Sequence, residues 1–328
     1  MIKSYLHRTM AVALAMAVFA ASAVHAQGAY PARPIRMIVP YAAGGGLDAI
    51  TRVVAQAMTE SLGQSIVVEN KAGGGGMIGA ESVARAAPDG YTLLMAGNPE
   101  LVINPNLAQG ARYNVVRDFI PIMLVAESPN IIVANPGLKT PLREIVDGSH
   151  KSDGSMTVGT PGQGSPQHLS VEVMRSLSKV DFVHVPYKGA GPAVVDVIGG
   201  QVRMAITGAP PLLPHIKSGK LRALAVTQAK RSSLVPDIPT FEEATGIKGL
   251  ETYSTWYGLL APAGTPPAVI ESLQKSIASV LSKPEIRTRL NDMGTEVVAT
   301  PGTAFGDRIK VELKRYEDVI RRFNIKSE

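Results

Sequence analysis

The chain has 328 residues, of which 45% are hydrophobic and 18% charged, a composition typical of a globular protein long enough for two domains. It contains no cysteine, which excludes disulfides, thiolate metal sites and a cysteine nucleophile. The formal net charge is +6 without any run of basic residues, so we do not expect nucleic acid as a partner.

The first 26 residues predict a secretory signal peptide. Lys3 and Arg8 precede an apolar stretch from Met10 to Ala23, and the segment ends in VHA, a small-x-small cleavage pattern. A membrane anchor is the alternative, but this stretch is shorter than the roughly 20 residues that span a bilayer. We therefore expect cleavage after Ala26 and a soluble mature protein outside the cytoplasm.

From residue 35 onward, the sequence repeats a β-branched strand, a glycine-rich turn and an amphipathic helix. The first half predicts strands at 35–40, 65–68 and 91–96, a helix with an apolar face from Ile50 to Leu62 that stops at Gly63, and a helix at 78–87. Such units build an α/β sheet with parallel strands, and ligands bind at the carboxyl ends of these strands.

Two apolar segments are expected to cross between two lobes. The first is 119–126, after which strand and helix units begin again, and the second starts at Thr252. Near the end, Thr265 is expected to cap a helix from Pro266 to about Ser282, and a last helix is expected over 305–323. We predict one lobe from 27–126 plus 250–328 and the other from 127–249.

The stretch from Gly74 to Gly79 fits the G-x-G-x-x-G pattern of dinucleotide sites, with Glu100 near the end of the next strand. Three points argue against a dinucleotide site. This unit is not the first of its sheet, and Glu100 lies further along the chain than the acidic residue of such sites. Nicotinamide cofactors are also not expected outside the cytoplasm. The alternative is a tight turn that lets the helix pack close to the sheet. We favour the turn and expect no cofactor.

Signatures of enzymes and metal sites are missing. The sequence has no phosphate loop, no H-E-x-x-H and no G-x-S-x-G. The histidines after the signal peptide, which are His150, His168, His184 and His215, form no recognised metal-ligand spacing. His168 alone is a site candidate, because it lies one turn into the helix after the Gly162–Ser165 loop, where it can face the crevice.

Five loops of small residues follow the predicted strands: 42–48, 97–98, 160–165, 187–189 and 207–209. Free N–H groups at helix N-termini bind anions, and small residues let a carboxylate approach them. Ser165 is expected to cap a helix that starts with Pro166, and Asp48 to cap another and order its loop. The alternative is that all five loops only connect strands to helices.

The chain resembles the periplasmic solute-binding proteins of tripartite tricarboxylate transporters, which are also known as Bordetella uptake gene (Bug-type) receptors. The resemblance covers essentially the whole mature chain. It rests on YPARPIRMIVPYAAGGGLDAITRVVAQAM, LGQSIVVENKAGGGGMIGAESVARAAPDGYTLLM, HVPYKGAGPAVVDVIGGQV, LPHIKSGKLRALAVT, VPDIPTFEEA and WYGLLAPAGTP, in family order.

The resemblance implies a two-lobed α/β fold of the periplasmic binding protein type II, or Venus flytrap, kind, with a mixed sheet flanked by helices in each lobe. It also implies a monomer that holds a small organic carboxylate (a di- or tricarboxylate, or an aromatic acid) through backbone amides and waters, and presents it to membrane transporter subunits. Carried onto this chain, the ligand-binding residues are Tyr41, Ala43, Gly44, Gly45, Asp48, Gly97, Asn98, Thr160, Gly162, Gly164, Ser165, His168, Tyr187, Gly189, Thr207 and Gly208. No catalytic and no metal-binding residue is implied.

Three positions depart from the family pattern. Gly46 stands where proline, serine or another side chain is more frequent, Pro166 replaces a common serine, and residues 205–209 read AITGA where a Phe-Asp pair is frequent. A missing side chain in the second lobe would widen the pocket for a larger or aromatic acid. Two alternatives stay open: a ligand-loaded partner of a membrane sensor kinase, and a secreted enzyme, for which no nucleophile or acid–base pair is evident.

Overall fold

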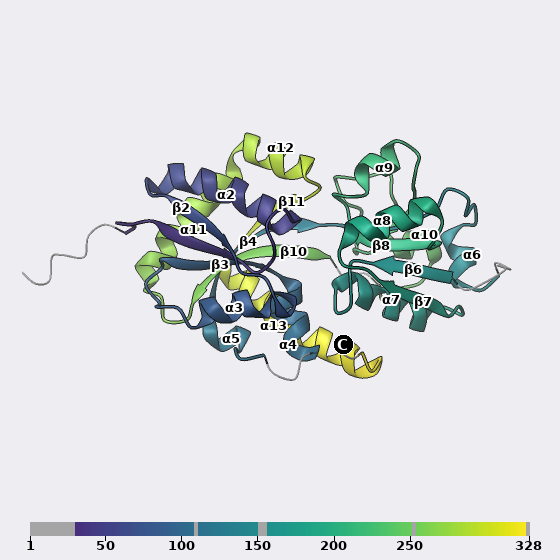
Figure 1. Ribbon diagram of the computed structural model, residues 1–328, viewed down its shortest axis with the longest axis horizontal. Helices are drawn as coiled ribbons and strands as arrows, with labels where there is room; N and C mark the ends of the chain where they lie inside the picture. Colours follow the sequence, from purple (N-terminus) through teal and green to yellow (C-terminus); the bar gives the residue numbers. More distant parts are fainter. Residues whose placement is uncertain (1–29, 108–110, 150–155, 251–253, 326–328) are drawn as a thin grey trace, which may run out of the picture.

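Two mixed β-sheets, each flanked by helices, form two lobes that lie side by side along the long axis of the molecule (Figure 1). The computed structural model describes residues 30–107, 111–149, 156–250 and 254–325. The predicted signal peptide, His150 and Thr252 lie outside these residues. Within them, no helix is both long and apolar enough to cross a membrane.

The first sheet has the strand order β11-β4-β10-β3-β1-β2. Its strands are β1 (Ile35–Val39), β2 (Ile66–Asn70), β3 (Thr92–Gly97), β4 (Phe119–Ser128), β10 (Thr255–Pro262) and β11 (Glu296–Pro301). β1 pairs in parallel with β2 and β3, as the repeated units predict. β10 pairs antiparallel with both β3 and β4, and β11 antiparallel with β4, so this sheet is mixed.

Helices of the first lobe cover this sheet. They are α2 (Gly46–Leu62), α3 (Met77–Ala84), α4 (Asn104–Leu107), α5 (Val115–Asp118), α11 (Pro267–Ser282), α12 (Pro284–Asp292) and α13 (Gly302–Arg322), with a 3₁₀ turn η2 (Gly74–Gly76) and a π-helical turn η3 (Pro99–Ile103). The predicted apolar face of α2 is buried from Ile50 to Met58. The helix ends at Gly63, whose φ of 68° is left-handed.

The second sheet has the order β7-β6-β8-β5-β9. Its elements are β5 (Asn130–Ala134), α6 (Leu142–Val146), β6 (Met156–Thr160), α7 (Pro166–Leu177), β7 (Phe182–Pro186), α8 (Ala190–Gly199), β8 (Met204–Gly208), α9 (Leu213–Lys217), β9 (Arg222–Val226) and α10 (Phe241–Thr245). β6 pairs in parallel with β7 and β8, whereas β5 runs antiparallel to β8 and β9.

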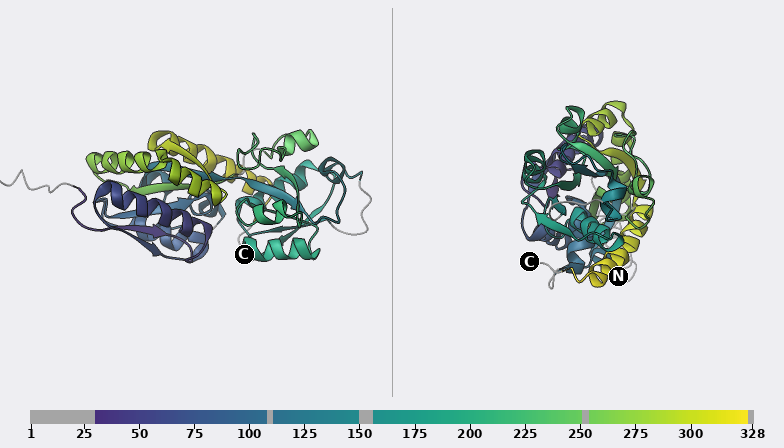
Figure 2. Two further views of the ribbon diagram at one scale, coloured as in Figure 1. Left: turned by 90° about the horizontal axis from the view of Figure 1, so that it is seen from above. Right: turned by 90° about the vertical axis from the view of Figure 1, so that its right-hand side faces the viewer.

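The chain passes between the sheets along two neighbouring strands. β4 ends at Ser128 in the first sheet, and β5 begins at Asn130 in the second, with only Pro129 between them. β10 brings the chain back, and it pairs with β4 from Thr255 opposite Ser128 to Pro262 opposite Phe119. The left-hand view in Figure 2 shows the lobes joined at this narrow region. The lobes also meet beside these strands, where Ser232 Oγ donates to Glu296 at 2.6 Å.

Three helix boundaries differ from the sequence-based prediction. Thr265 does not cap α11, since Pro266 is the residue before the helix and the Thr265 hydroxyl donates to Pro262 O at 2.8 Å. α13 starts at Gly302, three residues before the expected position. A Cβ on Gly302 would lie 2.1 Å from Pro121 O, so only glycine lets this helix start so close to β4. α3 ends at Ala84, three residues early.

Candidate functional site

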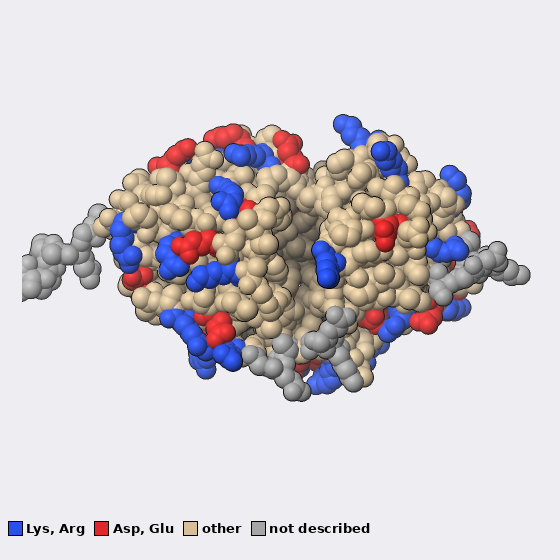
Figure 3. All heavy atoms as spheres, viewed as in Figure 1, with Lys and Arg blue, Asp and Glu red and all other residues tan. Residues whose placement is uncertain are grey.

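A cavity of about 800 Å³ lies between the lobes, at the carboxyl ends of the parallel strands. In the space-filling view a groove separates the two lobes at this level, and its walls are mostly uncharged (Figure 3). The first lobe contributes Tyr41, Gly44, Gly45, Gly46, Leu47, Asp48, Gly75, Gly97, Pro99, Asn104, Ser128, Thr255 and Tyr257. The second contributes Pro161, Gly162, Gln163, Gly164, Ser165, Pro166, Gln167, Ala190, Gly191, Thr207, Gly208, Pro210 and Pro211.

The loop before α2 forms one wall. Helix α2 begins at Gly46, with Gly45 as the N-cap residue and no side-chain cap. Asp48, expected as the cap, lies inside the first turn instead, where its Oδ2 accepts the N–H of Gly44 at 2.9 Å. Arg52 Nε donates to the same oxygen at 3.0 Å and Asn70 Nδ2 to Oδ1 at 3.0 Å. Asp48 therefore orders the loop, as expected, but from a different helix position.

The charge of Asp48 is satisfied inside the protein. Burial opposes its ionisation, but the hydrogen bonds from Arg52, Gly44 and Asn70 outweigh burial and lower its pKa. Asp48 is the single charged side chain among the described residues that line the cavity. Since no lysine, arginine or histidine of the described chain lines it, an anion there must be held by N–H, hydroxyl and amide donors.

The loop before α7 forms the opposite wall. Ser165 is the N-cap residue of α7 and Pro166 its first residue, as predicted. Ser165 Oγ accepts the N–H of His168 at 3.1 Å and donates to Gly162 O at 2.7 Å. Gly162 and Gly164 have φ values of 151° and 70°, so both positions favour glycine. The loop is thus held in one shape by its own hydrogen bonds.

His168 lies behind this loop and does not line the cavity. Its side chain is 4% exposed, and its Nδ1 accepts the N–H of Gly164 at 3.1 Å. Its ring stacks on that of His184 with centroids 4.1 Å apart, and His184 Nε2 lies 2.7 Å from Thr160 Oγ1. Burial lowers the pKa of His168 to about 3 and that of His184 to about 4, so both rings are neutral. The two neutral rings therefore support the loop from behind, on the side away from the cavity.

Of the residues expected to bind the ligand, ten line the cavity: Tyr41, Gly44, Gly45, Asp48, Gly97, Gly162, Gly164, Ser165, Thr207 and Gly208. Six do not: Ala43, Asn98, Thr160, His168, Tyr187 and Gly189. The Asn98 side chain is fully buried and its Nδ2 donates to Ser254 O at 2.8 Å. The Tyr187 hydroxyl donates to Asp196 at 2.6 Å, within the second lobe.

A polar group near the crossings was not predicted. Gln167 Nε2 donates to Asn130 Oδ1 at 2.7 Å and to Thr255 Oγ1 at 3.2 Å, and Thr255 Oγ1 donates to Asn130 Oδ1 at 3.1 Å. Gln167 and Thr255 line the cavity together with Tyr257. From the sequence, Thr255 and Tyr257 could be placed only in the second crossing, which starts at Thr252. The sequence did not indicate which face of this crossing meets the cavity.

The glycine-rich turn at residues 73–79 packs a helix rather than forming a separate site. A Cβ on Gly79 would lie 2.7 Å from the backbone of Pro40 and 2.8 Å from Lys71 O, so α3 approaches β1 as only glycine allows. Gly75 alone from this turn lines the cavity. This agrees with the tight-turn interpretation of the G-x-G-x-x-G pattern.

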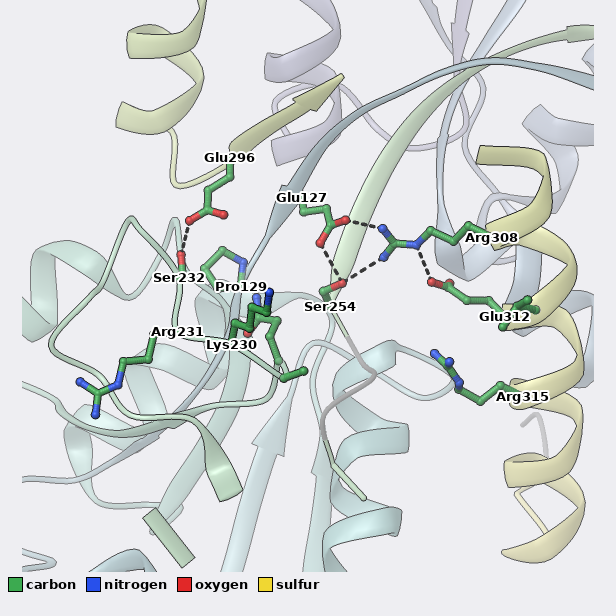
Figure 4. A pocket seen from close by; sticks show the side chains of 13 residues that line it. Glu127, Pro129, Lys230, Arg231, Ser232, Ser254, Glu296, Arg308, Glu312 and Arg315 are labelled. Atoms are coloured by element: carbon green, nitrogen blue, oxygen red, sulfur yellow. Dashed lines mark hydrogen bonds and ion pairs between the residues drawn. The ribbon is translucent and has the colours of Figure 1, made fainter. Parts of the chain in front are cut away.

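A second cavity, of about 620 Å³, lies beside the crossings (Figure 4). There Arg308 of α13 pairs with Glu127 of β4, with Glu312 at 2.7 Å and with Ser254 Oγ at 3.3 Å. On its other side, Ser232 of the second lobe donates to Glu296 of β11 at 2.6 Å. These polar side chains tie the lobes and crossings together, so we place the functional site in the larger cavity.

Comparison with known proteins is consistent with this geometry. The family model described as "Tripartite tricarboxylate transporter family receptor" matches residues 50–325. The chain belongs to this family. Protein BugT of Bordetella pertussis is 38% identical over 300 residues, which are 90% of this chain and 91% of BugT.

Solved structures agree on the fold. The Rhodopseudomonas palustris protein Rpa4515, solved with adipate, superposes with a TM-score of 0.79 at 30% identity, covering 90% of this chain and 99% of that one. MatC from the same species, solved with malate, gives 0.75 at 32% identity, covering 89% and 100%. The receptor is therefore a two-lobed periplasmic solute-binding protein, and the fold that the sequence resemblance implied is confirmed.

Proposed function

We propose that this receptor captures a small organic carboxylate in the cavity between its lobes and presents it to membrane transporter subunits. One observation carries the proposal: the N-termini of α2 and α7 line the same cavity from opposite lobes. Both helices are long enough for a developed dipole, with 17 and 12 residues. Two such termini attract a ligand that carries negative charge at both ends.

The apolar part of the lining supports an acid with a sizeable carbon skeleton. Tyr41, Leu47, Tyr257 and the proline pair at 210–211 contribute apolar surface to a cavity of about 800 Å³. Two similar proteins, Rpa4515 solved with adipate and MatC solved with malate, support a dicarboxylate. Thr207 and Gly208, from the AITGA segment, leave room on the second-lobe side, and this keeps an aromatic acid in the proposal.

The proposed cycle contains no chemical step. The predicted signal peptide directs the chain to the periplasm, where it acts as a monomer. Its lobes, 27–126 with 250–328 and 127–249, close over the acid by a hinge motion at the two crossings, because the bound acid favours the closed population. No observation above favours a sensor kinase or an enzyme over this role.

Thermal unfolding with a panel of acids tests the proposal. The panel contains aliphatic dicarboxylates, tricarboxylates, aromatic acids, amino acids and NAD. An acid at 100 times its dissociation constant should stabilise the protein by about 2.7 kcal/mol, a shift of several degrees. A shift with NAD alone, conversion of a bound acid into a product, or no shift with any carboxylate would contradict the proposal.

A further inference from the structure

Glu100 is a carboxylate directly beneath the cavity. Its side chain is 0% exposed and lies in η3, just after β3. Its Oε2 accepts the hydroxyl hydrogen of Tyr41 at 2.6 Å, and its Oε1 accepts the N–H of Gly97 at 2.6 Å. Tyr41 and Gly97 both line the cavity, whereas Glu100 does not. One buried carboxylate therefore holds two lining residues of the first lobe.

The groups around Glu100 include no cation that pairs with it among the described residues. Tyr41 faces it from the loop after β1, Tyr257 from β10 and Tyr113 from the segment before α5, and the electrostatic influence of Glu100 reaches all three hydroxyls. The acidic residue of α3 is Glu81, which acts on Tyr113. On the side of α13, the hydroxyl of Tyr316 lies 3.5 Å from Asn98 Nδ2.

This environment leaves Glu100 close to its titration point at neutral pH. Burial without a cationic partner raises its pKa, and the hydrogen bonds from Tyr41 and Gly97 oppose that rise, with a resulting pKa of about 7. Glu100 thus exchanges its proton near pH 7, and it lies two contacts away from the proposed anion site. Ligand binding can therefore change whether Glu100 is charged.

We propose that Glu100 is a positioning residue whose protonation sets the affinity of the cavity, so that the receptor takes up a fraction of a proton per molecule when it binds a carboxylate near neutral pH. This inference rests on the proposed function. A bound anion and an ionised Glu100 repel each other across a buried region, so the ligand favours the neutral acid. By linkage, the neutral acid favours the ligand by the same factor.

The hydroxyl of Tyr41 offers a second route for the coupling. It has one hydrogen, which is donated to Glu100 when that carboxylate is ionised. A protonated Glu100 can instead donate to the Tyr41 oxygen, and the Tyr41 hydrogen is then available for another acceptor. Tyr41 lines the cavity, so the same proton both removes a negative charge and adds a donor near the ligand.

Among the described residues beside the cavity, Asp48, His168 and His184 do not exchange protons between pH 6.5 and 9. His168 and His184 have pKa values of about 3 and 4, and the pKa of Asp48 is lowered below its usual range. Simple carboxylate ligands, with pKa values of about 4 to 5, are ionised over this range. A pH dependence of affinity measured there isolates Glu100.

Calorimetric titration of the purified protein tests the inference. Adipate, malate and benzoate are each titrated at pH 6.5, 7.5 and 9, in two buffers with different ionisation enthalpies at each pH. We expect affinity to fall roughly five- to tenfold from pH 6.5 to 9, the size of a one-unit rise in the pKa of Glu100 on binding. The difference between buffers should show an uptake of about half a proton near pH 7.5, which is the largest uptake that a one-unit rise in the pKa of Glu100 can give.

Two variants and a control assign the effect. Glu100→Gln should bind with the affinity of the parent at pH 6.5 across the whole range, without proton uptake. Tyr41→Phe, which removes a donor to the ionised carboxylate, should move the midpoint of the pH dependence to higher pH. The control Glu172→Gln changes a buried carboxylate behind His168, outside the cavity, and should keep the pH dependence of the parent.

The outcomes separate the two proposals. If none of the acids binds at any pH, the proposed carboxylate function fails. If an acid binds with the same affinity at pH 6.5 and 9 and without proton uptake, the function stands and the role of Glu100 is wrong. A pH dependence that persists in Glu100→Gln would also overturn it, and if that variant does not fold, the midpoint of Tyr41→Phe decides.

Discussion

At Gly45 the backbone has φ −76° and ψ 167°, a conformation that any residue adopts. A Cβ there would meet only Ala42 O, at an ordinary contact distance of 3.6 Å. The neighbouring Gly44 differs, because its φ of 86° favours glycine. Gly45 is thus a cavity position where a side chain can be added with little disturbance of the fold.

We predict that Gly45→Val lowers carboxylate affinity at least tenfold, because the isopropyl group keeps the ligand from the N-terminus of α2. Its unfolding free energy should fall by about 1 kcal/mol or less, since valine is a poorer N-cap than glycine. Calorimetry and urea denaturation measure the two effects. Gly199→Val is the matched control, since a Cβ at Gly199 meets nothing within 4 Å and lies outside the cavity. Unchanged affinity in Gly45→Val would count against the α2 loop as a binding element.

Residue types predicted the cavity loops better than they predicted side-chain directions. Glycines and a helix N-cap residue can be recognised in the sequence itself. The cavity-lining loops at 44–45, 162–165 and 207–208 could therefore be predicted from it. His168 was expected to face the crevice, but the side chain of this first-turn residue points back under the loop and accepts from Gly164. Asn98 turns into the core toward Ser254. Such directions depend on tertiary packing, which one sequence does not show.

Helix α13 joins both crossings through Arg308. The guanidinium pairs with Glu127 at the end of β4 and with Glu312, and it donates to Ser254 just before β10. Glu312 also accepts from Trp256 Nε1 at 2.7 Å. Because the Arg308 side chain is only 28% exposed, its loss leaves two partly or fully buried carboxylates without their cation.

We predict that Arg308→Ala lowers the unfolding free energy by about 2 to 4 kcal/mol, and that Arg308→Lys recovers only part of it, since lysine lacks the planar fork. Arg321→Ala is the control on the same helix, where an exposed arginine pairs with Asp318. Exposed pairs of this kind contribute about 1 kcal/mol or less. Urea denaturation measures all three, and equal losses for Arg308→Ala and Arg321→Ala would refute the special role of Arg308.

The strands and long helices followed from sequence because apolar periodicity marks them directly, as in β1 and α2. The π-helical turn at Pro99–Ile103 and the early start of α13 at Gly302 did not. The start of α13 depends on a close approach of distant backbone, that of Gly302 to Pro121 O. The same limit explains why the place of β10 between β3 and β4 could not be derived.

At the scale of the whole molecule, buried ionisable groups make stability depend on pH. His168 and His184 have folded pKa values of about 3 and 4, below the unfolded value of about 6.5, so the native state binds fewer protons and loses stability as pH falls below 6.5. Glu100 has the opposite effect on stability between its unfolded pKa and about 7, because in this range Glu100 keeps its proton in the folded state and loses it in the unfolded state. Burial also raises the pKa of Glu172, which adds to the effect of Glu100, so the two carboxyls offset part of the loss that the histidines cause.

We predict that the unfolding free energy falls by up to about 1.4 kcal/mol per pH unit between pH 6.5 and 4.5, the net effect of one titrating group. Glu100→Gln should make the slope steeper, and His184→Gln should make it shallower. The exposed-loop substitution Lys230→Gln serves as the control that leaves the slope unchanged. Urea denaturation at four pH values measures it, and a stability that is flat or rises toward pH 4.5 would contradict the neutral buried histidines.

The packing at the crossings has an optical consequence. Trp256 is the only tryptophan in the sequence, and it is fully buried at the start of β10, between Phe305 and the Arg308 guanidinium. Its indole therefore sits at the pivot of the proposed closure. The tryptophan fluorescence of this protein, excited selectively over its tyrosines, comes from one reporter whose surroundings change if the crossings bend. Lobe closure can thus be followed by stopped-flow emission without attaching a dye.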